Sequence, residues 1–243
     1  RTAQEAEKAN LAKTDFLRRM SHDVRTPING IQGCVDIADR YPDDMKLQQE
    51  ARTRIRTASS YLLNLVNDVL DMNKLESGNI QLERKHFNLL ELLHNTNEIT
   101  RMQANESGVN YYVEDGEIIH TQLTGSPVHF QQILMNIGSN AVKYNHNGGS
   151  VTVTCREVSY TDTTAEYELT CTDTGIGMSE EFQKRAFEAF AQEGQSARTK
   201  YAGTGLGLAI ARKLTELQGG TLFFESIQGK GTKFILHISF EIS

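Results

Sequence analysis

Apolar residues recur along the N-terminal part of the chain at the spacing of three and four that is typical of amphipathic helices. The pattern predicts one helix from about Thr2 to Arg40, which the segment Tyr41–Asp43 ends, and a second from about Met45 to Ser77. Gly78 is expected to terminate the second helix, because glycine adopts a left-handed backbone at little cost. The first stripe comprises Met20, Val24, Pro27, Ile31, Val35 and Ala38, and the second comprises Ile55, Ala58, Leu62, Leu65, Val69 and Met72.

These two helices are expected to form an antiparallel hairpin, since only a short turn joins them. Two long apolar stripes present more apolar surface than one hairpin can cover, and pairing with a second copy would bury the remainder. We therefore predict that residues 1–78 form a dimerisation domain built as a homodimeric four-helix bundle. The alternative is an ordinary intramolecular helical pair.

Beyond Gly78 the pattern changes to short strands that alternate with helices. The change predicts a domain boundary at Ser77–Ile80 and a second domain, an α/β sandwich, over residues 79–243, so that the whole chain is an α+β multidomain protein. Strands are expected at Ile80–Glu83, Val109–Val113, Ile118–Leu123, Val151–Cys155, Glu166–Cys171, Thr221–Ser226 and Thr232–Phe240.

Helix boundaries in the second domain are indicated by capping residues. Asn88 followed by Glu91 is a capping box, and Ser126 before a proline predicts the start of a helix over about Pro127–Tyr144. A further helix is expected to end at Gly219–Gly220.

Composition and charge exclude several functions. The net charge of -6 argues against a nucleic-acid binder, which needs a clustered positive face. Three cysteines without a CxxC pair indicate neither a disulfide framework nor a zinc site, and are expected to be buried thiols. No apolar run has the length of a membrane span, and the N-terminus lacks a signal-peptide core.

The segment FLRRMSHDVRTPINGI, residues 16–31, presents one histidine at a defined place on the first helix. His22 lies about half a turn from the apolar stripe, so its imidazole is expected to face solvent, where it can act as a nucleophile. Asp23 can hold one ring nitrogen, and the hydroxyl of Thr26 can reach the same space. Pro27 should bend or loosen the helix just beyond. From this segment alone, chance remains an equal explanation.

A polar face is predicted on the C-terminal half of the helix QQILMNIGSNAVKY. Asn136, Asn140, Lys143 and Tyr144 recur there at spacings of four, three and one. An amide oxygen can bind a hard cation, and a lysine can meet phosphate. The alternative is a solvated helix face.

Two glycine-rich segments complete the candidate chemistry. In DTGIG, Gly175 and Gly177 allow a flat ligand to approach the backbone closely, and the carboxylate of Asp173 can accept a hydrogen bond from an exocyclic amino group. In GTGLG, residues 203–207, free amides at the start of a helix suit phosphate. The polar stretch 178–202 between them has the length of a mobile lid. Each loop alone could be an ordinary turn, and neither is a dinucleotide fingerprint, a Walker motif or a calcium loop.

Taken together, these motifs carry a family resemblance that covers nearly the whole chain. The run SHDVRTPINGI resembles the phosphoacceptor box of sensor histidine kinases. The segments NxxxNAxKY, DTGIGMS, FEAF and GTGLGLAI follow in the order of the N, G1, F and G2 boxes of the Bergerat-type ATP-binding domain, which they resemble.

The resemblance implies a two-component kinase that transfers the γ-phosphoryl group of magnesium-ATP to His22, and then to an aspartate on a response-regulator receiver domain. Asp23 would orient the imidazole, and Thr26 would assist dephosphorylation of the regulator. The phosphoacceptor domain would be a homodimer. The chain begins at Arg1 in sequence of helical composition, which suggests a cytoplasmic fragment of a membrane-bound bacterial sensor whose upstream sensor or membrane segment is missing.

In the second domain the resemblance implies that Asn140 holds Mg²⁺ and that Asp173 reads adenine. Asn136, Lys143 and Tyr144 would line the nucleotide pocket. The loop residues implied in nucleotide binding are Gly175, Gly177, Gly203, Thr204, Gly205, Leu206 and Gly207.

One position distinguishes transfer from hydrolysis. In the gyrase, MutL and chaperone branches of this ATPase superfamily, a glutamate four residues before the magnesium asparagine acts as a base, whereas here Asn136 cannot take a proton. Phosphoryl transfer is therefore favoured over hydrolysis. The competing hypothesis is a dimeric, nucleotide-dependent interaction module without kinase turnover.

Three residues depart from the family pattern. Ser126 stands where aspartate is usual, and His129 stands where arginine is frequent; we expect little consequence, because serine caps a helix equally well. Gln192 stands where some members carry a basic residue near the γ-phosphate. Cations that could substitute for it are Arg185, Arg198 and Lys200.

Overall fold

The computed structural model describes residues 2–193 and 204–243, with side chains from Met20 onward except those of His22 and Glu76. Backbone contacts divide the chain into two compact units, Arg1–Asp71 and Met72–Ser243. No helix in the described part of the chain combines the length and the apolar character that a membrane span requires.

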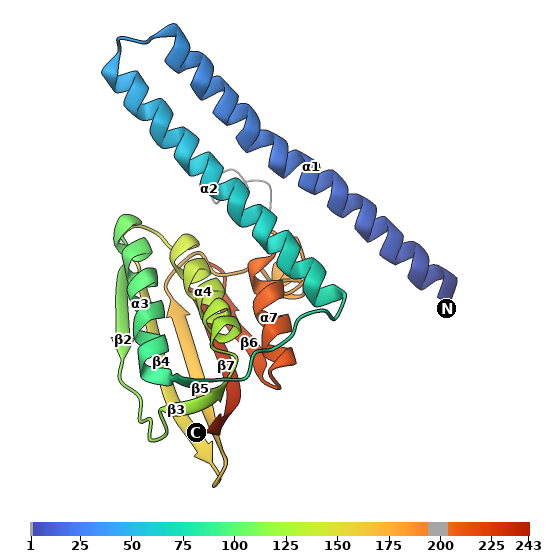
Figure 1. Cartoon of the computed structure of the whole chain (residues 1–243), viewed down its shortest axis with the longest axis vertical. Helices are drawn as coiled ribbons and strands as arrows, with labels where there is room; N and C mark the ends of the chain where they lie inside the picture. Colours follow the sequence, from blue (N-terminus) through green and yellow to red (C-terminus); the bar gives the residue numbers. More distant parts are fainter. Residues whose placement is uncertain (1, 194–203) are drawn as a thin grey trace. The chain divides into compact units, whose positions relative to one another are not determined.

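The first unit is a helical hairpin, as predicted (Figure 1). Helix α1 (Thr2–Arg40) continues through Pro27, and α2 (Met45–Glu76) begins after Asp44, whose carboxylate caps it by accepting two backbone N–H groups at 3.0 Å. Gly78 has φ +67 just beyond α2, which confirms it as the terminating residue.

Nearly all members of the predicted apolar stripes are at least partly buried. Leu65 on α2 is only 1% exposed, and the other five members of its stripe are partly buried. The stripe of α1 is partly buried at every position except Val35, which is 43% exposed. The helical period is therefore correct, and Val35 belongs to the outer surface of the hairpin.

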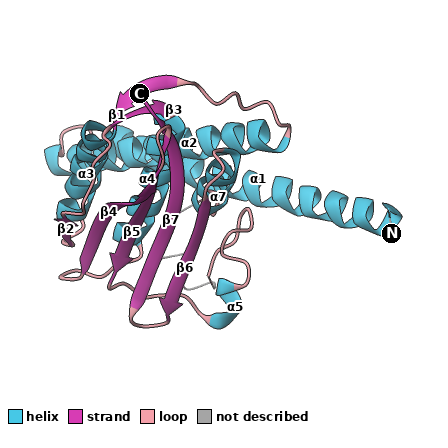
Figure 2. Ribbon diagram, turned by 90° about the horizontal axis from the view of Figure 1, so that it is seen from below, coloured by secondary structure: helices cyan, strands magenta, loops and turns pink. Residues whose placement is uncertain are grey.

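The second unit contains one mixed seven-stranded sheet in the order β1-β3-β7-β5-β4-β2, with β6 also paired to β7 (Figure 2). Among the strand pairs of the described residues, β2–β4 alone is parallel. One edge of β7 pairs β5, and its other edge pairs β6 and then β3, so β7 joins all parts of the sheet. The strands are β1 (Lys85–Asn88), β2 (Asn110–Glu114), β3 (Gln122–Gly125), β4 (Ser150–Tyr160), β5 (Thr164–Asp173), β6 (Thr221–Ile227) and β7 (Gly231–Ile242).

Helices α3 (Leu89–Glu106), α4 (Pro127–Lys143) and α7 (Gly207–Leu217) cover one face of this sheet (Figures 1 and 2). Alternate residues of β5 and β7 point under the helices and are buried, as period-two patterning requires. A short helix, α5 (Glu180–Gln183), follows β5.

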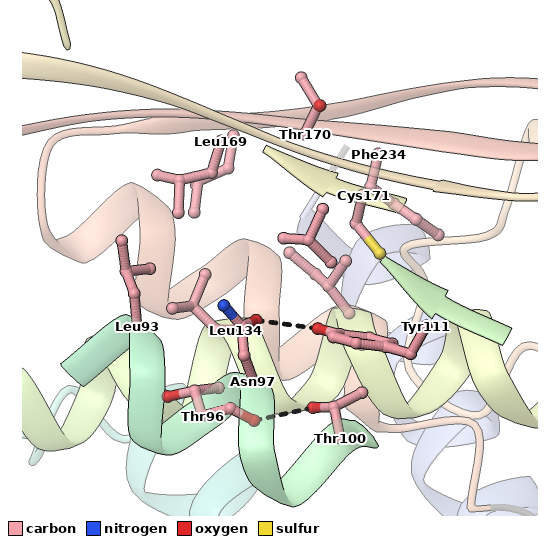
Figure 3. A pocket seen from close by; sticks show the side chains of 14 residues that line it. Leu93, Thr96, Asn97, Thr100, Tyr111, Leu134, Leu169, Thr170, Cys171 and Phe234 are labelled. Carbon is pink, nitrogen blue, oxygen red and sulfur yellow. Dashed lines mark hydrogen bonds between the residues drawn. The ribbon is translucent and has the colours of Figure 1, made fainter. Parts of the chain in front are cut away.

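A small cavity lies in this core between α3, α4 and the sheet (Figure 3). Its volume is about 30 Å³, which suits one water molecule. Tyr111 lines it and donates a hydrogen bond to Asn97 at 2.8 Å, while the hydroxyl of Thr100 donates to the backbone of Thr96 at 3.0 Å. These polar groups are satisfied within the protein, so the cavity is a packing feature of the core.

Two predicted strands are wrong. Residues 80–83 form no strand, because the four-residue β3 pairs with Lys85–Asn88 and offers them no partner. The strand predicted at Ile118–Leu123 begins only at Gln122. The preceding backbone is held instead by the side chain of Glu157, whose carboxylate accepts the N–H groups that a strand neighbour would otherwise take.

Of the two predicted helix caps in the second unit, one is confirmed and one is wrong. Asn88 caps α3 by accepting the N–H of Glu91 at 3.0 Å, as the sequence predicts. Helix α4 begins at Pro127, but Ser126 does not cap it through its side chain. Its hydroxyl lies 2.7 Å from Nδ1 of His129 instead, so the expected serine cap is wrong because the imidazole competes for that hydroxyl.

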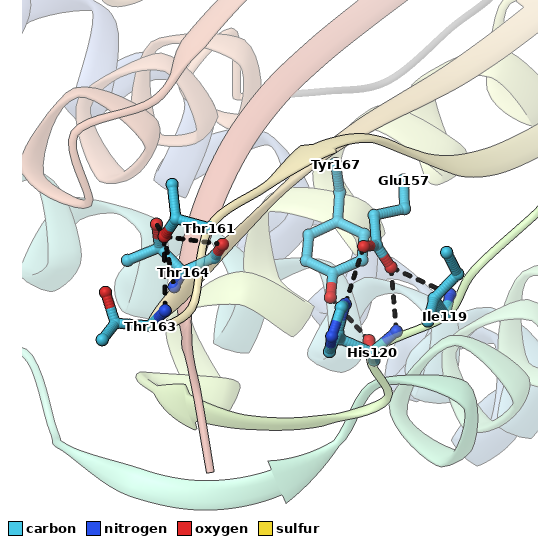
Figure 4. Close-up of polar contacts among 7 residues, drawn as sticks. All are labelled: Ile119, His120, Glu157, Thr161, Thr163, Thr164 and Tyr167. Atoms are coloured by element: carbon cyan, nitrogen blue, oxygen red, sulfur yellow. Dashed lines mark hydrogen bonds and ion pairs between the residues drawn. The ribbon is translucent and has the colours of Figure 1, made fainter.

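Glu157 is expected to be the largest single polar contributor to the stability of this unit (Figure 4). Its side chain is only 3% exposed. The carboxylate accepts hydrogen bonds from the backbone N–H groups of Ile119 and His120 and lies against Nδ1 of His120, each at 2.8 Å. Burial alone would raise the pKa of Glu157, but these hydrogen bonds outweigh it and lower the pKa. Glu157→Ala should therefore reduce the free energy of unfolding by about 3 kcal/mol at pH 7.

Urea unfolding followed by circular dichroism at pH 7 and pH 3 checks this expectation. Because a lowered carboxyl pKa stabilises the folded state only above that pKa, the gap between wild type and variant should shrink as the pH falls below about 4. Glu225→Ala, an exposed glutamate on β6, is the control and should change stability by less than about 0.5 kcal/mol. Equal losses in both variants would contradict the assignment.

Candidate nucleotide and phosphoacceptor sites

The polar face of α4 places four predicted residues together. Asn136, Asn140 and Lys143 lie on its last turns, and Tyr144 is its C-terminal cap. The amide nitrogen of Asn136 is buried and has no hydrogen-bond partner among the residues that the structure describes. A buried amide without a partner is costly, so a bound polar ligand would satisfy it.

The first turn of α7 lies against this face of α4. A methyl group added at Gly207 would lie 3.5 Å from Oδ1 of Asn136 and 3.8 Å from Nδ2 of Asn140. No side chain in the described ranges caps α7, so the N–H groups of its first turn are open to an anion, which the helix dipole favours. The preceding loop is anchored by Leu206, which is fully buried.

Asp173 ends β5 beside this helix pair and is 6% exposed. Its Oδ1 accepts the backbone N–H of Gly175 at 2.8 Å and of Thr232 at 3.3 Å. Burial raises the pKa of Asp173 to about 6, although these two hydrogen bonds act to lower it. The carboxylate is thus ionised at neutral pH, and Oδ2 can accept a hydrogen bond from an amino group.

The glycines after Asp173 are required by close backbone contacts. A methyl group on Gly175 would lie 2.3 Å from the carbonyl oxygen of Tyr144, and the next residue, Ile176, donates its N–H to that same oxygen at 3.0 Å. Gly177 has φ +61, and a methyl group there would lie 2.1 Å from the carbonyl oxygen of Ile227. The DTGIG loop is therefore wedged between the end of α4 and the β6–β7 hairpin.

The FEAF segment contacts the glycine-rich loop that precedes α7. Phe190 donates its N–H to the carbonyl of Gly205 at 2.9 Å. Phe190 has φ +65, which is uncommon for a residue other than glycine, and Gly205 has φ +70. A methyl group on Gly205 would lie 2.9 Å from the carbonyl oxygen of Ala191, so the two segments are packed backbone against backbone.

Lys143 and Tyr144 form a pair at the end of α4. The Nζ atom of Lys143 lies 4.7 Å from the centroid of the Tyr144 ring. Burial, and after it the charge of Glu193, raises the pKa of Tyr144, so its phenol stays protonated. Glu193 itself accepts the N–H of Ser179 at 2.8 Å.

The phosphoacceptor segment belongs to the other unit. His22 lies within α1, but its side chain falls outside the described atoms, as does its predicted solvent exposure. Asp23 is partly buried and Thr26 is exposed. Asp23 lies close enough to Tyr61 on α2 for its charge to act, because burial first and then the charges of Asp23 and Asp68 raise the pKa of Tyr61.

The structure thus brings together most of the residues predicted for the α/β unit. The N, G1 and G2 segments lie side by side: Asn136 faces the first turn of α7 at Gly207, and Ile176 of the DTGIG loop donates its N–H to the carbonyl of Tyr144. Arg185 donates to the backbone carbonyl of Gln192 at 3.4 Å. The predicted residues Gly203, Arg198 and Lys200 lie outside the described residues, as does the last part of the predicted lid, residues 194–202.

Two residues of this site were missed from the sequence. Thr232 is 6% exposed and donates its backbone N–H to Asp173, and Ser226 accepts the N–H of Met178 at 2.9 Å. The only local signal was the tight GKGTKF turn between the last two predicted strands, which did not reveal that this hairpin contacts a loop far away in the sequence.

The arrangement suits an adenine nucleotide. Asp173 offers a carboxylate oxygen for an amino group, and the buried amide nitrogen of Asn136 has no partner among the described residues. Gly175 and Gly177 let the loop backbone pack closely against its neighbours, and the N-terminus of α7 suits phosphate.

Comparison with known proteins agrees with this chemistry. Residues 12–78 match the family described as the His Kinase A (phospho-acceptor) domain, and residues 125–242 match the histidine kinase-, DNA gyrase B- and HSP90-like ATPase family. The sensory/regulatory protein RpfC of Xanthomonas campestris is 34% identical over 234 residues, which are 96% of this chain and 32% of that protein.

Two further relatives extend the comparison. The signal transduction histidine-protein kinase BarA of Escherichia coli is 32% identical over 98% of this chain and 26% of its own length. The crystal structure of full-length ShkA in complex with AMPPNP has a TM-score of 0.66 at 28% identity, and covers 93% of this chain and 46% of that one. The chain spans about a third or less of the curated relatives named here. With both domain families in order along its length, the chain belongs to the sensor histidine kinase family and carries residues of its catalytic core.

Proposed function

We propose that this chain binds magnesium-ATP in its α/β unit, transfers the γ-phosphoryl group to His22, and passes it on to an aspartate of a response-regulator receiver domain. The observation that carries the proposal is the site around Asp173, Asn136 and Gly207, which is built for an adenine nucleotide within a histidine kinase-like ATPase domain. ShkA, a relative by structure, was solved with AMPPNP, which supports ATP as the nucleotide.

Several of the proposed nucleotide-binding roles are supported by contacts described above. Oδ2 of Asp173 would accept a hydrogen bond from the adenine amino group, because Oδ1 is already occupied by two backbone N–H groups. Asn136, Lys143 and Tyr144 would line the pocket. The loop of Thr204, Gly205, Leu206 and Gly207, together with Gly203, would hold the phosphates at the N-terminus of α7.

Magnesium would be held by the side-chain oxygen of Asn140, which lies one turn beyond Asn136 on the same face of α4. A neutral amide oxygen suits this hard cation, and the triphosphate supplies further oxygen ligands. When bound, the ion neutralises charge that develops on the phosphate oxygens.

Transfer to His22 needs no protein base. A ring nitrogen attacks the γ-phosphorus in line, the bond from that phosphorus to the bridging oxygen breaks, and ADP leaves. Asp23 would hold the other ring nitrogen and orient the imidazole. Asn136 supports transfer over hydrolysis, since an amide cannot deprotonate a water.

Phosphohistidine would then give its phosphoryl group to the receiver aspartate and return to neutral imidazole. Thr26 is exposed one turn beyond His22 on α1, where its hydroxyl could orient a water for dephosphorylation of the regulator. The presence of a phospho-acceptor family domain over residues 12–78 supports a receiver domain as the partner.

A homodimer is supported by apolar side chains that the hairpin leaves exposed. On α2, Leu63, Val66 and Leu70 follow one face and are 63%, 47% and 51% exposed. A second copy of the hairpin would cover them in a four-helix bundle. We assign residues 1–78 to this dimerisation and phosphoacceptor domain and residues 79–243 to the ATP-binding domain. The chain would be a cytoplasmic part of a membrane-bound sensor.

Autophosphorylation with γ-labelled ATP and magnesium tests the proposal on the wild type, His22→Gln and Asn140→Ala. The wild type should acquire acid-labile, base-stable label, and both variants should lose it by at least about a hundredfold. His22→Gln should still bind ATP, whereas Asn140→Ala should lose the dependence of binding on magnesium.

The other outcomes are equally informative. A wild type that binds ATP but takes up no label would favour the nucleotide-dependent interaction module. Label that survives in His22→Gln would identify a different nucleophile. Thr26→Ala should retain autophosphorylation and lose dephosphorylation of the regulator, and an unchanged phosphatase activity would remove the role given to Thr26.

A further inference from the structure

Ser226 lies where the β6–β7 hairpin meets the loop that begins at Asp173. Its hydroxyl oxygen accepts the backbone N–H of Met178 at 2.9 Å, and its proton is directed to the carbonyl of Gly231 at 3.1 Å. The hydroxyl of Thr232 lies 2.9 Å from the same oxygen. Because a carbonyl can only accept, Ser226 donates to Gly231 and Thr232 donates to Ser226.

This assignment uses the full hydrogen-bonding capacity of the serine, which is one donor and two acceptor positions. Met178, whose N–H takes one of those positions, is 9% exposed, and Thr232 is 6% exposed. Loss of the Ser226 hydroxyl would therefore leave buried polar groups without their partner.

The same serine connects both ends of the loop from Asp173 to Met178. The Met178 end is bound directly, and the side chain of Gln183 reinforces it by donating to the carbonyls of Met178 at 2.9 Å and Ser226 at 3.2 Å. The Asp173 end is bound through Thr232, whose backbone N–H donates to Oδ1 of Asp173. The contacts close a ring that holds Oδ1 of Asp173 on backbone N–H groups and leaves Oδ2 for a ligand.

We infer that Ser226 is a positioning residue for base selection: it holds Thr232 and Met178 so that Oδ2 of Asp173 faces the amino group of adenine. The inference deepens the proposed function and rests on it, because it presumes that Asp173 reads the base. Ser226 does not touch the nucleotide in this scheme. Its effect is on the relative affinity for two purines, one with an amino group and one with a carbonyl oxygen at the same ring position.

Calorimetric titration of the whole chain with ATP and with inosine triphosphate, in the presence of magnesium, tests the inference. Inosine carries a carbonyl oxygen in place of the amino group, so an ionised carboxylate should reject it. Ser226→Ala should raise the Kd for ATP about tenfold and the Kd for inosine triphosphate by less than about twofold. Ser226→Thr keeps the hydroxyl and should restore the wild-type ratio of the two constants.

A matched control separates positioning from a general loss of stability. Tyr167→Phe removes another buried hydrogen bond, from the Tyr167 hydroxyl to the carbonyl of His120 at 2.6 Å, at a point on β5 away from Asp173 (Figure 4). It should lower the urea midpoint to a similar degree as Ser226→Ala and leave the ratio of the two dissociation constants unchanged.

The outcomes distinguish this inference from the proposed function. A wild type that prefers ATP, together with a Ser226→Ala variant that keeps that preference, would overturn the inference alone. Equal weakening of both nucleotides in Ser226→Ala would also overturn it, because a structural role suffices for that result. A wild type that binds neither nucleotide, or both equally, would overturn the reading of adenine by Asp173 itself.

Discussion

Replacing Asp173 by asparagine is expected to stabilise the nucleotide-free protein while it abolishes selective ATP binding. The buried carboxyl has its pKa raised to about 6 from an ordinary value of 3.8, so the folded state holds an unfavourable charge at pH 8. Removing that charge should raise the free energy of unfolding by about 3 kcal/mol. An asparagine with Oδ1 toward the two backbone N–H groups presents its own amino group to adenine, and the Kd for ATP should rise at least about a hundredfold.

Urea unfolding at pH 8 and pH 5 measures the stability change, and titration with ATP measures the binding. A raised carboxyl pKa means that the wild type gains stability as the pH falls from about 7 to 4, so the advantage of Asp173→Asn should disappear over that interval. Asp162→Asn, in the exposed β4–β5 turn, is the control and should alter neither quantity appreciably. A destabilised Asp173→Asn variant at pH 8 would show that the buried charge is compensated.

The second large effect is expected at Gly175, where a methyl group would lie 2.3 Å from the carbonyl of Tyr144 and 2.9 Å from Oδ1 of Asp173. Both neighbours belong to the site, and the nearer one is backbone that cannot rotate away. Gly175→Ala should therefore displace the loop, lower the free energy of unfolding by about 2 to 4 kcal/mol and raise the Kd for ATP more than about tenfold.

Gly219→Ala provides the comparison for Gly175→Ala. Gly219 has φ +75 and no atom within 4 Å of an added methyl group, so its substitution costs backbone strain of about 1 kcal/mol without moving a neighbour. Thermal unfolding and ATP titration of the two variants side by side separate strain from collision. If Gly175→Ala bound ATP with the wild-type Kd, the loop would have space for the methyl group, and the close contact with Tyr144 would not constrain the site.

Local rules accounted for most of the elements. The cap that Asn88 provides for α3, the terminating Gly78 and the alternation of buried positions along β5 each depend on neighbours within a few residues, and the structure confirms them. The chemistry of the α/β unit was equally accessible, because the family motifs are short and ordered along the chain.

The misplaced strand and the missed Thr232 share one cause, which is a partner distant in the sequence. The backbone of Ile119 and His120 binds the carboxylate of Glu157 and not a neighbouring strand, and no pattern within residues 118–123 signals that. Thr232 likewise meets Asp173 across 59 positions, and its contribution there is a backbone N–H that any residue except proline could supply. Ser126 was misassigned because a histidine within reach took the place of a backbone N–H.

The place of β7 in the sheet also bears on how this unit forms during synthesis. β7 follows β1, β3 and β5 in the chain, yet β1 and β3 join the rest of the sheet only through it. As the polypeptide leaves the ribosome, these earlier strands therefore have unsatisfied edges until residues 231–242 emerge. The sheet can close only late, so a nascent chain that stalls before β7 has neither a finished sheet nor the Thr232 whose N–H binds Asp173.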